Sequence, residues 1–173
     1  SFPDPESIIR HIRTVADNLE TPVIFYNASG RTGNPVSVDT IETLLSLDNI
    51  VGLKDSSLDY HNFAELLRRY PDKNDRPGTI MQADEFVLDA SLLMGADGIV
   101  SGAGVAYIKT LLALYEAGEK GDRLNAIMRQ QQFTKDFLRM MGPNPSRDWM
   151  YMIKAELVRR GILSKAHVTT PFL

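Results

Sequence analysis

The chain has 173 residues, of which 43% are hydrophobic and 24% are charged, a composition typical of a soluble globular domain with a sizeable core. Nineteen basic and 22 acidic residues leave a formal net charge of −3, so no basic excess indicates a nucleic acid or an anionic membrane as a partner. The absence of cysteine excludes disulfides, thiolate metal ligands and cysteine nucleophiles.

The first third of the chain predicts a helix, a strand and a second helix. Asp4 is suited to the N-cap of a helix, because a periodic apolar pattern follows it over residues 5–19. Residues 22–26 form a short apolar run rich in β-branched and aromatic residues, which predicts a buried strand, and residues 27–34 are turn-forming. Residues 38–47 show helical spacing again.

The strand-then-helix pattern continues to the C-terminal part of the chain. Residues 50–53 predict a second buried strand, and Asp55 to Ser57 provide N-cap chemistry for a helix through Leu67. The remaining elements that we predict are strands at 79–81 and 98–101, helices at 85–94 and 107–117, and two C-terminal helices, 122–140 and 146–160, separated by a break at 142–145.

Strands that are apolar throughout and alternate with helices predict an α/β fold with a parallel sheet covered on both faces. Four such βα units fit half of a (β/α)8 TIM barrel or a small open sheet. A complete barrel usually needs roughly 250 residues, more than this chain has. A free half-barrel is disfavoured, because its edge strands expose unpaired backbone groups and its inner face exposes valine and isoleucine.

The residues that follow each predicted strand lie at the carboxyl edge, where functional groups gather in parallel α/β folds. In chain order these residues are Tyr26, Asn27, Arg31, Thr32, Gly33, Lys54, Asp55, Ser56, Gln82, Asp84, Val100, Ser101 and Gly102.

Lys54 is the most informative of these residues, because it comes directly after an apolar strand. Apolar surroundings penalise the charged form of a lysine, and a neutral amine can attack a ketone and form an imine, which is an electron sink. The phenol of Tyr26, at the end of a neighbouring strand, can shuttle protons. The positions of these residues in the sequence are also compatible with roles outside catalysis. Lys54 and the hydroxyl of Tyr26 could simply be solvated, and Arg31 could pair with a carboxylate.

Three stretches of the sequence carry a recognisable pattern: residues 22–27, 31–33 and 49–55. Together they resemble the strand-five, loop and strand-six signatures of the dihydrodipicolinate synthase and N-acetylneuraminate lyase family of class I, pyruvate-dependent aldolases. Residues 95–102 are similar to the strand-eight signature, and residues 153–162 resemble the C-terminal helix. The resemblance implies the second half of a TIM barrel, with strands five to eight in residues 1–121 and a C-terminal helical extension of the same domain in residues 122–173.

The resemblance also implies roles by position. Lys54 matches the imine-forming lysine of the family, and Tyr26 matches its proton-relay tyrosine. Arg31 matches a loop arginine that helps to bind or admit the second substrate in synthases, and Val100 matches a residue whose backbone carbonyl faces the lysine. The residues that we expect to bind substrate are Arg31, Thr32, Val100 and Ser101.

The chain departs from the family pattern in several places. Ser29 stands where many members have proline, and Gln82 stands where synthases commonly have glycine. The run Lys-Asp-Ser-Ser from Lys54 resembles the sugar-acid and hydroxy-oxoglutarate aldolase branches. The family's carboxylate-binding Gly-Thr-Thr-Gly-Glu-like loop and its second relay tyrosine are absent from these 173 residues. We therefore expect a fragment of a longer protein or a chain that assembles with a complementary half, with weak activity or none by itself.

The sequence thus predicts a lyase or aldolase that acts on pyruvate or another 2-oxo acid, such as a 2-keto-3-deoxy sugar acid or 4-hydroxy-2-oxoglutarate. Dihydrodipicolinate synthase is the alternative enzyme, and a non-catalytic half-barrel assembly module or inactive fragment is the alternative of another class. The expected partners are a small 2-oxo acid and either further copies of the chain or a missing N-terminal half.

No cofactor is expected, and the three histidines are too far apart in the sequence to suggest a metal site. No apolar run approaches the ~20 residues that span a bilayer, and the first twenty residues lack the apolar segment of a signal peptide. The cytoplasm is therefore the expected compartment.

Overall fold

The computed structural model describes residues 4–142 and 145–169, and the side chains of residues 145–148 are not described. The chain divides into two compact units, Ser1–Val100 and Ser101–Leu173.

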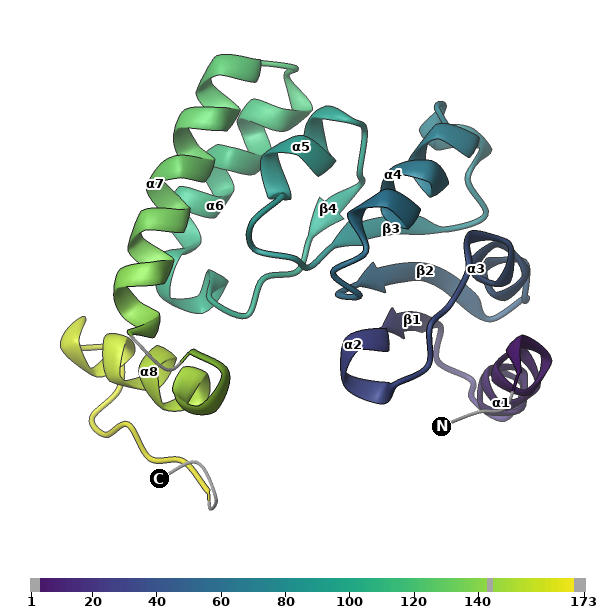
Figure 1. The fold of residues 1–173 in the computed structure, drawn as a ribbon, viewed down its shortest axis with the longest axis horizontal. Coiled ribbons are helices and arrows are strands. Elements are labelled where there is room, and N and C mark those ends of the chain that lie inside the picture. Colours follow the sequence, from purple (N-terminus) through teal and green to yellow (C-terminus); the bar gives the residue numbers. More distant parts are fainter. Residues whose placement is uncertain (1–3, 143–144, 170–173) are drawn as a thin grey trace. The chain divides into compact units, whose positions relative to one another are not determined.

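The first unit is an α/β unit built on a four-stranded sheet (Figure 1). Its strands β1 (Val23–Asn27), β2 (Ile50–Asp55), β3 (Thr79–Gln82) and β4 (Gly98–Ile99) lie in the order β1-β2-β3-β4, and every neighbouring pair is parallel. The helical segments of this unit are α1 (Pro5–Asp17), α2 (Ser29–Thr32), α3 (Val38–Leu45), α4 (Tyr60–Arg69), η1 (Lys73–Asp75) and α5 (Leu88–Leu93). The prediction of successive parallel βα units is confirmed.

The hydrophobic core of the first unit lies on one face of the sheet. Leu44 of α3 and Leu66 of α4 are completely buried together with Leu53 of β2 and Ile80 of β3, and Ile8 of α1 joins the same cluster. Figure 1 shows α1, α3 and α4 beside the strands that they cover. Burial of these aliphatic side chains, each worth about 1.5–3 kcal/mol, holds the helices against the sheet.

The other face of the sheet, which we call the open face, carries Ile24, Tyr26, Val51, Lys54 and Met81. Ile24 is 48% exposed and Val51 is 42% exposed within the described residues. The sequence predicted a sheet covered on both faces, and within the first unit the helical core covers one. Exposed valine and isoleucine side chains are what we expected of a half-barrel that stands alone.

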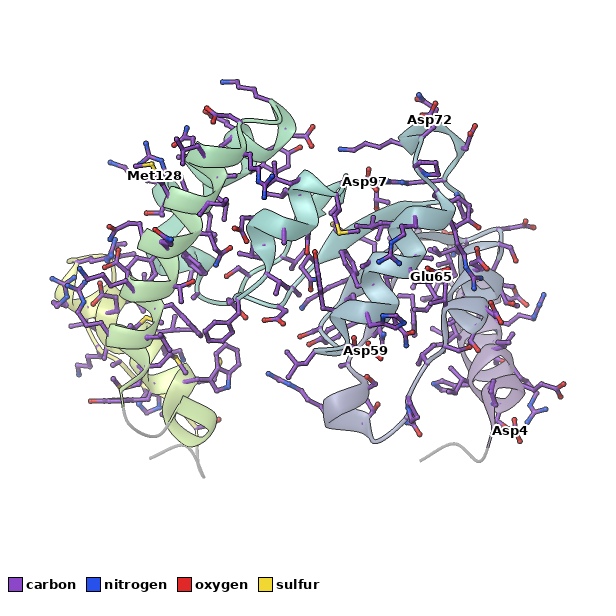
Figure 2. All side chains as sticks on the ribbon, turned by 45° about the horizontal axis from the view of Figure 1, so that its top comes forward. Asp4, Asp59, Glu65, Asp72, Asp97 and Met128 are labelled. Atoms are coloured by element: carbon purple, nitrogen blue, oxygen red, sulfur yellow. The ribbon has the colours of Figure 1, made fainter. Side chains whose placement is uncertain are left out.

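Aspartate side chains begin several of the helical segments (Figure 2). The backbone N–H of Ser7 donates to Asp4 at 2.7 Å, so the predicted N-cap of α1 is confirmed. The backbone N–H of Asn62 donates to Asp59 at 3.1 Å at the start of α4. The prediction that residues 55–57 cap this helix is therefore wrong, because Asp55 is still part of β2.

Several further boundaries differ from the prediction, and three of them shape the ends of the strands and the connections that follow. The turn-forming stretch 27–34 contains the short helix α2, which ends at Gly33 with φ +69°, a conformation that glycine adopts at no steric cost. β2 extends through Asp55, so Lys54 lies within the strand and not after it. α5 is shorter than predicted, because the chain forms turns at Asp84 and Val87 before the helix begins.

The second unit consists of three helices, α6 (Gly104–Glu119), α7 (Arg123–Met141) and α8 (Pro145–Arg159). α7 packs against α6, and α8 contacts both. The rings of Tyr107 and Phe133 meet edge to face with their centroids 6.2 Å apart. Gly142 ends α7 as predicted, and residues 143–144 of the predicted break lie outside the described residues. Pro145, which we placed in the break, is already the first residue of α8.

The helices of the second unit begin before the boundary that we predicted at 121/122, because α6 packs with α7 and α8. The assignment of residues 1–121 to one barrel half stays a prediction. Within the part of the chain that the structure describes, no helix combines the length and the hydropathy needed to cross a membrane.

Candidate active site

Lys54 and Tyr26 lie side by side on the open face. The register of β1 and β2 pairs the two residues directly, and paired residues of parallel strands point to the same face of a sheet. The Nζ atom of Lys54 lies 4.0 Å from the centroid of the Tyr26 ring, which is a cation–π contact. Lys54 is half-buried, whereas Tyr26 is 43% exposed. The two residues that the sequence singled out are therefore in contact.

The neighbour of Lys54 on its other side is Met81 of β3, which is paired with it in the sheet. Lys54 thus lies in one row of paired residues, between Tyr26 and Met81. Among the described residues no carboxylate lies within ion-pair distance of Lys54. Functional groups of parallel α/β folds gather at this carboxyl edge of the strands, so the position suits a reacting amine.

A second row of polar residues lies on the helix-covered face, one residue further along each strand. Asn27, Asp55 and Gln82 are paired in register across β1, β2 and β3, and each is at most 4% exposed. We call these three residues the polar row. The sequence placed them at strand ends but did not predict that they face away from Tyr26 and Lys54.

Asp55 is the best connected member of the polar row. Asn27 Nδ2 donates to Asp55 Oδ2 at 2.7 Å, and the backbone N–H and Oγ of Ser57 donate to Asp55 Oδ1 at 3.0 and 2.7 Å. Burial raises the pKa of the Asp55 carboxyl, and the hydrogen bonds from Ser57 and Asn27 oppose that rise. The carboxylate thereby joins β1, β2 and the loop that follows β2.

Gln82 shapes the loop after β3 in a similar way. Its Oε1 accepts hydrogen bonds from the backbone N–H groups of Ala83 and Asp84 at 2.9 and 2.8 Å, and its Nε2 donates to Ser91 Oγ at 3.3 Å. Gln82 therefore supports the β3–α5 loop from behind the sheet and does not face the amine of Lys54.

Arg31 and Thr32 lie on α2, in the connection that follows β1, and both are exposed. The hydroxyl of Thr32 accepts a hydrogen bond from the N–H of Asn34 at 3.3 Å. Thr32 also lines a pocket of about 200 Å³ together with Tyr26 and Asn27 of β1 and Ile8 and Ile12 of α1. Arg31 and Thr32, two of the four predicted substrate-binding residues, thus lie at the same edge of the sheet as Tyr26.

Val100 follows β4 at the same edge, and its N–H donates to the carbonyl of Gln82 at 2.8 Å. Ser101 is the first residue of the second unit, and its carbonyl accepts from the N–H of Gly104 at the start of α6. The contribution of these two residues to substrate binding stays a prediction. Among the described residues, no three histidine, aspartate or glutamate side chains are grouped as metal ligands.

The sequence model of the Dihydrodipicolinate synthetase family matches residues 2–173. Among curated proteins, 4-hydroxy-tetrahydrodipicolinate synthase of Chloroherpeton thalassium is 29% identical over 167 residues, which cover 95% of this chain and 52% of that protein. The protein of the same name from Methanospirillum hungatei is 32% identical over 120 residues, which cover 69% of this chain and 40% of that protein. The chain spans about half the length of the curated relatives that it matches.

Solved structures share the fold. Dihydrodipicolinate synthase from Bacteroides thetaiotaomicron superimposes with a TM-score of 0.85 at 21% identity, over 98% of this chain and 56% of that one. An N-acetylneuraminate lyase from Mycoplasma synoviae superimposes with a TM-score of 0.77 at 20% identity, over 98% of this chain and 54% of that one. The four parallel strands and their helices therefore match part of a TIM barrel.

Proposed function

Because the chain belongs to the dihydrodipicolinate synthetase family, we propose that it carries the imine-forming half, strands five to eight, of a Schiff-base lyase acting on pyruvate or another 2-oxo acid. The contact between Lys54 Nζ and the Tyr26 ring, 4.0 Å apart at the carboxyl edge of the sheet, is the observation that carries the proposal. It brings a nucleophilic amine and a proton-transferring phenol together where parallel α/β enzymes keep their reacting groups.

In the proposed reaction, the neutral amine of Lys54 attacks the ketone carbon of the 2-oxo acid and forms a carbinolamine. The hydroxyl of Tyr26 gives a proton to the departing oxygen, and water leaves as the protonated imine forms. In condensation, the Tyr26 phenolate takes a proton from the adjacent carbon, the resulting enamine adds to an aldehyde, and Tyr26 returns the proton to the new alkoxide oxygen. In cleavage, the phenolate takes the proton of the substrate hydroxyl, the carbon–carbon bond breaks to release an aldehyde and an enamine, and Tyr26 returns the proton to the enamine carbon. Water then hydrolyses the protonated imine, its proton goes to the Tyr26 phenolate, and the neutral amine of Lys54 is restored.

The remaining residues are assigned to substrate binding. The guanidinium of Arg31 and the hydroxyl of Thr32 suit the carboxylate or hydroxyl groups of a substrate, since both residues follow β1 at the same edge as Tyr26. Val100 and Ser101 follow β4 and offer backbone and hydroxyl groups. Their roles are carried over from the family resemblance.

The substrate is proposed to be a 2-keto-3-deoxy sugar acid or 4-hydroxy-2-oxoglutarate, on the basis of the Lys-Asp-Ser-Ser run. Dihydrodipicolinate synthesis is the second candidate, and the names of the curated relatives favour it. The buried position of Gln82 also weakens the sequence argument against a synthase, because its side chain lies on the far side of the sheet from Lys54.

A non-catalytic assembly module is the rival from another class. The exposed Ile24 and Val51 on the open face favour it, because apolar side chains on a sheet face are normally covered. Both readings require a partner that completes the sheet, either another copy of the chain or a complementary half.

The test is the intact mass of the chain after incubation with pyruvate and borohydride. We expect one reduced pyruvate adduct, which is lost in Lys54→Ala and kept in Lys109→Ala, a change at an exposed lysine of α6. An adduct that persists in Lys54→Ala would refute the assignment of the imine lysine. No adduct in the wild-type chain would show that the chain by itself is not competent and would favour the assembly module.

A further inference from the structure

The pairing of β1 with β2 is irregular, and the irregularity decides what lies beside Lys54. Val23 is paired with Ile50, but the next residue, Ile24, is paired with Gly52, so that Val51 is an extra residue in β2. This is a β-bulge, in which two residues of one strand oppose one residue of its neighbour.

Without the bulge, the register that begins at Val23 would continue along the strands. Tyr26 would then be paired with Leu53, and Asn27 would be paired with Lys54. Because a shift of one residue moves a side chain to the other face of the sheet, Tyr26 and Lys54 would point to opposite faces. The contact between them therefore depends on the bulged register.

Contacts on both sides of the bulge fix the position of β1. Within the described residues it is the edge strand of the sheet and pairs only with β2. The backbone N–H of Val23 donates to the carbonyl of Asn49 at 2.8 Å, which is compatible with either register beyond it. Beyond the bulge, Phe25 and Leu53 both lie in the core, and the N–H of Ser56 donates to the carbonyl of Asn27 at 2.9 Å, so these contacts also favour the bulged register.

The first side-chain bond beyond the bulge that joins β1 to β2 is that between Asn27 and Asp55. Asn27 Nδ2 and Asp55 Oδ2 are 2.7 Å apart, and both residues are almost completely buried. In the unbulged register Asn27 would face Lys54, and the buried carboxylate of Asp55 would lose one of its three hydrogen bonds. A buried carboxylate that loses a donor is costly, so this bond favours the bulged register.

We infer that Asn27 and Asp55 are positioning residues that help to select the bulged register at the end of β1 and thereby hold Tyr26 against Lys54. The inference rests on the proposed function for its catalytic consequence, but the register that it explains is a property of the fold. Asn27 and Asp55 act from the helix-covered face, on the opposite side of the sheet from the side chain of Lys54. Their loss is expected to loosen the carboxyl end of β1 and to separate the phenol from the amine, whereas Phe25 and Leu53 keep the core on the helix-covered face.

The variants separate this role from general stability. Asn27→Ala removes the bond between the strands, with Asn27→Ser as a milder second variant. Ser57→Ala is the matched control, because it removes a hydrogen bond of 2.7 Å to the same carboxylate without affecting the link from β1 to β2. Asp55→Asn is the conservative rescue, since a carboxamide there can accept from Ser57 and donate to the oxygen of a flipped Asn27 side chain.

Two readouts are used on the whole chain. The first is the nuclear Overhauser effect between the Tyr26 ring and the ε-methylene of Lys54, which needs no substrate. The second is the rate at which pyruvate and borohydride modify Lys54. We expect both Asn27 variants to lose the Tyr26–Lys54 effect and to be modified at least tenfold more slowly, whereas Ser57→Ala and Asp55→Asn keep the effect and stay within about threefold of the wild-type rate.

Retention of the Tyr26–Lys54 effect in Asn27→Ala would overturn the inference, as would an equal loss in Ser57→Ala. A wild-type chain that shows the effect but forms no adduct would contradict the proposed function alone. The register inference would then be decided by the nuclear Overhauser data from the same variants.

Discussion

Replacement of Arg76 by methionine is expected to destabilise the first unit strongly without disturbing the candidate site. The side chain of Arg76 is 3% exposed, and its Nη1 lies 2.8 Å from Asp97 Oδ1. Its Nε and Nη2 donate to the carbonyl of Tyr70 at 3.2 and 3.1 Å. The other oxygen of Asp97 accepts from the N–H of Ile80 at 2.7 Å, so the pair ties the start of β3 to the turn before β4.

The magnitude follows from what the substitution leaves behind. Methionine fills much of the volume, but the Asp97 carboxylate keeps only the Ile80 N–H and Lys73, whose Nζ is 4.0 Å away and partly in solvent. Breaking a buried ion pair by removing one partner costs about 3–5 kcal/mol. Because Lys73 compensates part of this loss, we expect a cost near the lower limit, about 3 kcal/mol.

The assay is urea unfolding of the chain, followed by the fluorescence and circular dichroism of wild type and Arg76→Met. Arg68→Met is the control, because Arg68 pairs with Glu65 at 3.0 Å on the surface and the loss of such a pair changes stability little. The amino-terminal edge of a parallel sheet serves stability, so the modification rate of Lys54 per folded molecule should be unchanged. A stability loss no larger than that of Arg68→Met would refute the reasoning.

Two further substitutions test packing and charge. A methyl group on Gly52 would lie 2.3 Å from the hydroxyl oxygen and 2.9 Å from the carbonyl oxygen of Thr79, so Gly52→Ala should lower the midpoint of urea unfolding markedly. Gly30→Ala is the control, because a methyl group there meets only a carbonyl oxygen at 3.7 Å and should leave the midpoint unchanged. Equal midpoints of the two variants would contradict this reasoning. In the helical unit, hydrogen bonds from Arg159 and Arg160 hold the pKa of Glu156 at about 2, below its usual 4.5. Because the folded-state pKa is depressed, this stabilisation is complete above about pH 4.5 and is lost as the pH falls towards 2. Thermal melts should therefore fall more steeply over this range in wild type than in Glu156→Gln, and parallel curves would rule the pair out as the cause.

The elements of the fold could be predicted because each has a local cause. Apolar runs bounded by turn residues mark β1 to β3, and the aspartate before α1 marks its first turn. Where the prediction of residues 55–57 as a cap was wrong, the cause was the length of β2, which apolar composition alone does not reveal, since its last two residues are charged. Strand boundaries of this kind depend on pairing with neighbours.

The candidate site could be predicted only in part for the same reason. Lys54 and Tyr26 were identified from their order along the chain, and the structure adds that they touch. The bulge at Val51 and the polar row could not be predicted, because both depend on how β1 lies against β2, and the spacing of apolar runs contains no information on register. The sequence does place a polar residue, Asn27 or Asp55, directly after Tyr26 and Lys54. That these residues form a buried row on the opposite face can be recognised only once the register of the strands is known.

The alternation between the open face and the polar row has a consequence for how this fold can change over evolutionary time. The proposed reacting groups, Tyr26 and Lys54, and the polar row occupy adjacent positions of the same strands but opposite sides of the sheet. A mutation at Ile24 or Met81 alters the surface around Lys54 while leaving the hydrogen bonds of Asn27, Asp55 and Gln82 intact. Substitutions on the open face can therefore be sampled without the loss of the loops that the polar row supports, and a directed-evolution library confined to that face should contain a high fraction of folded variants.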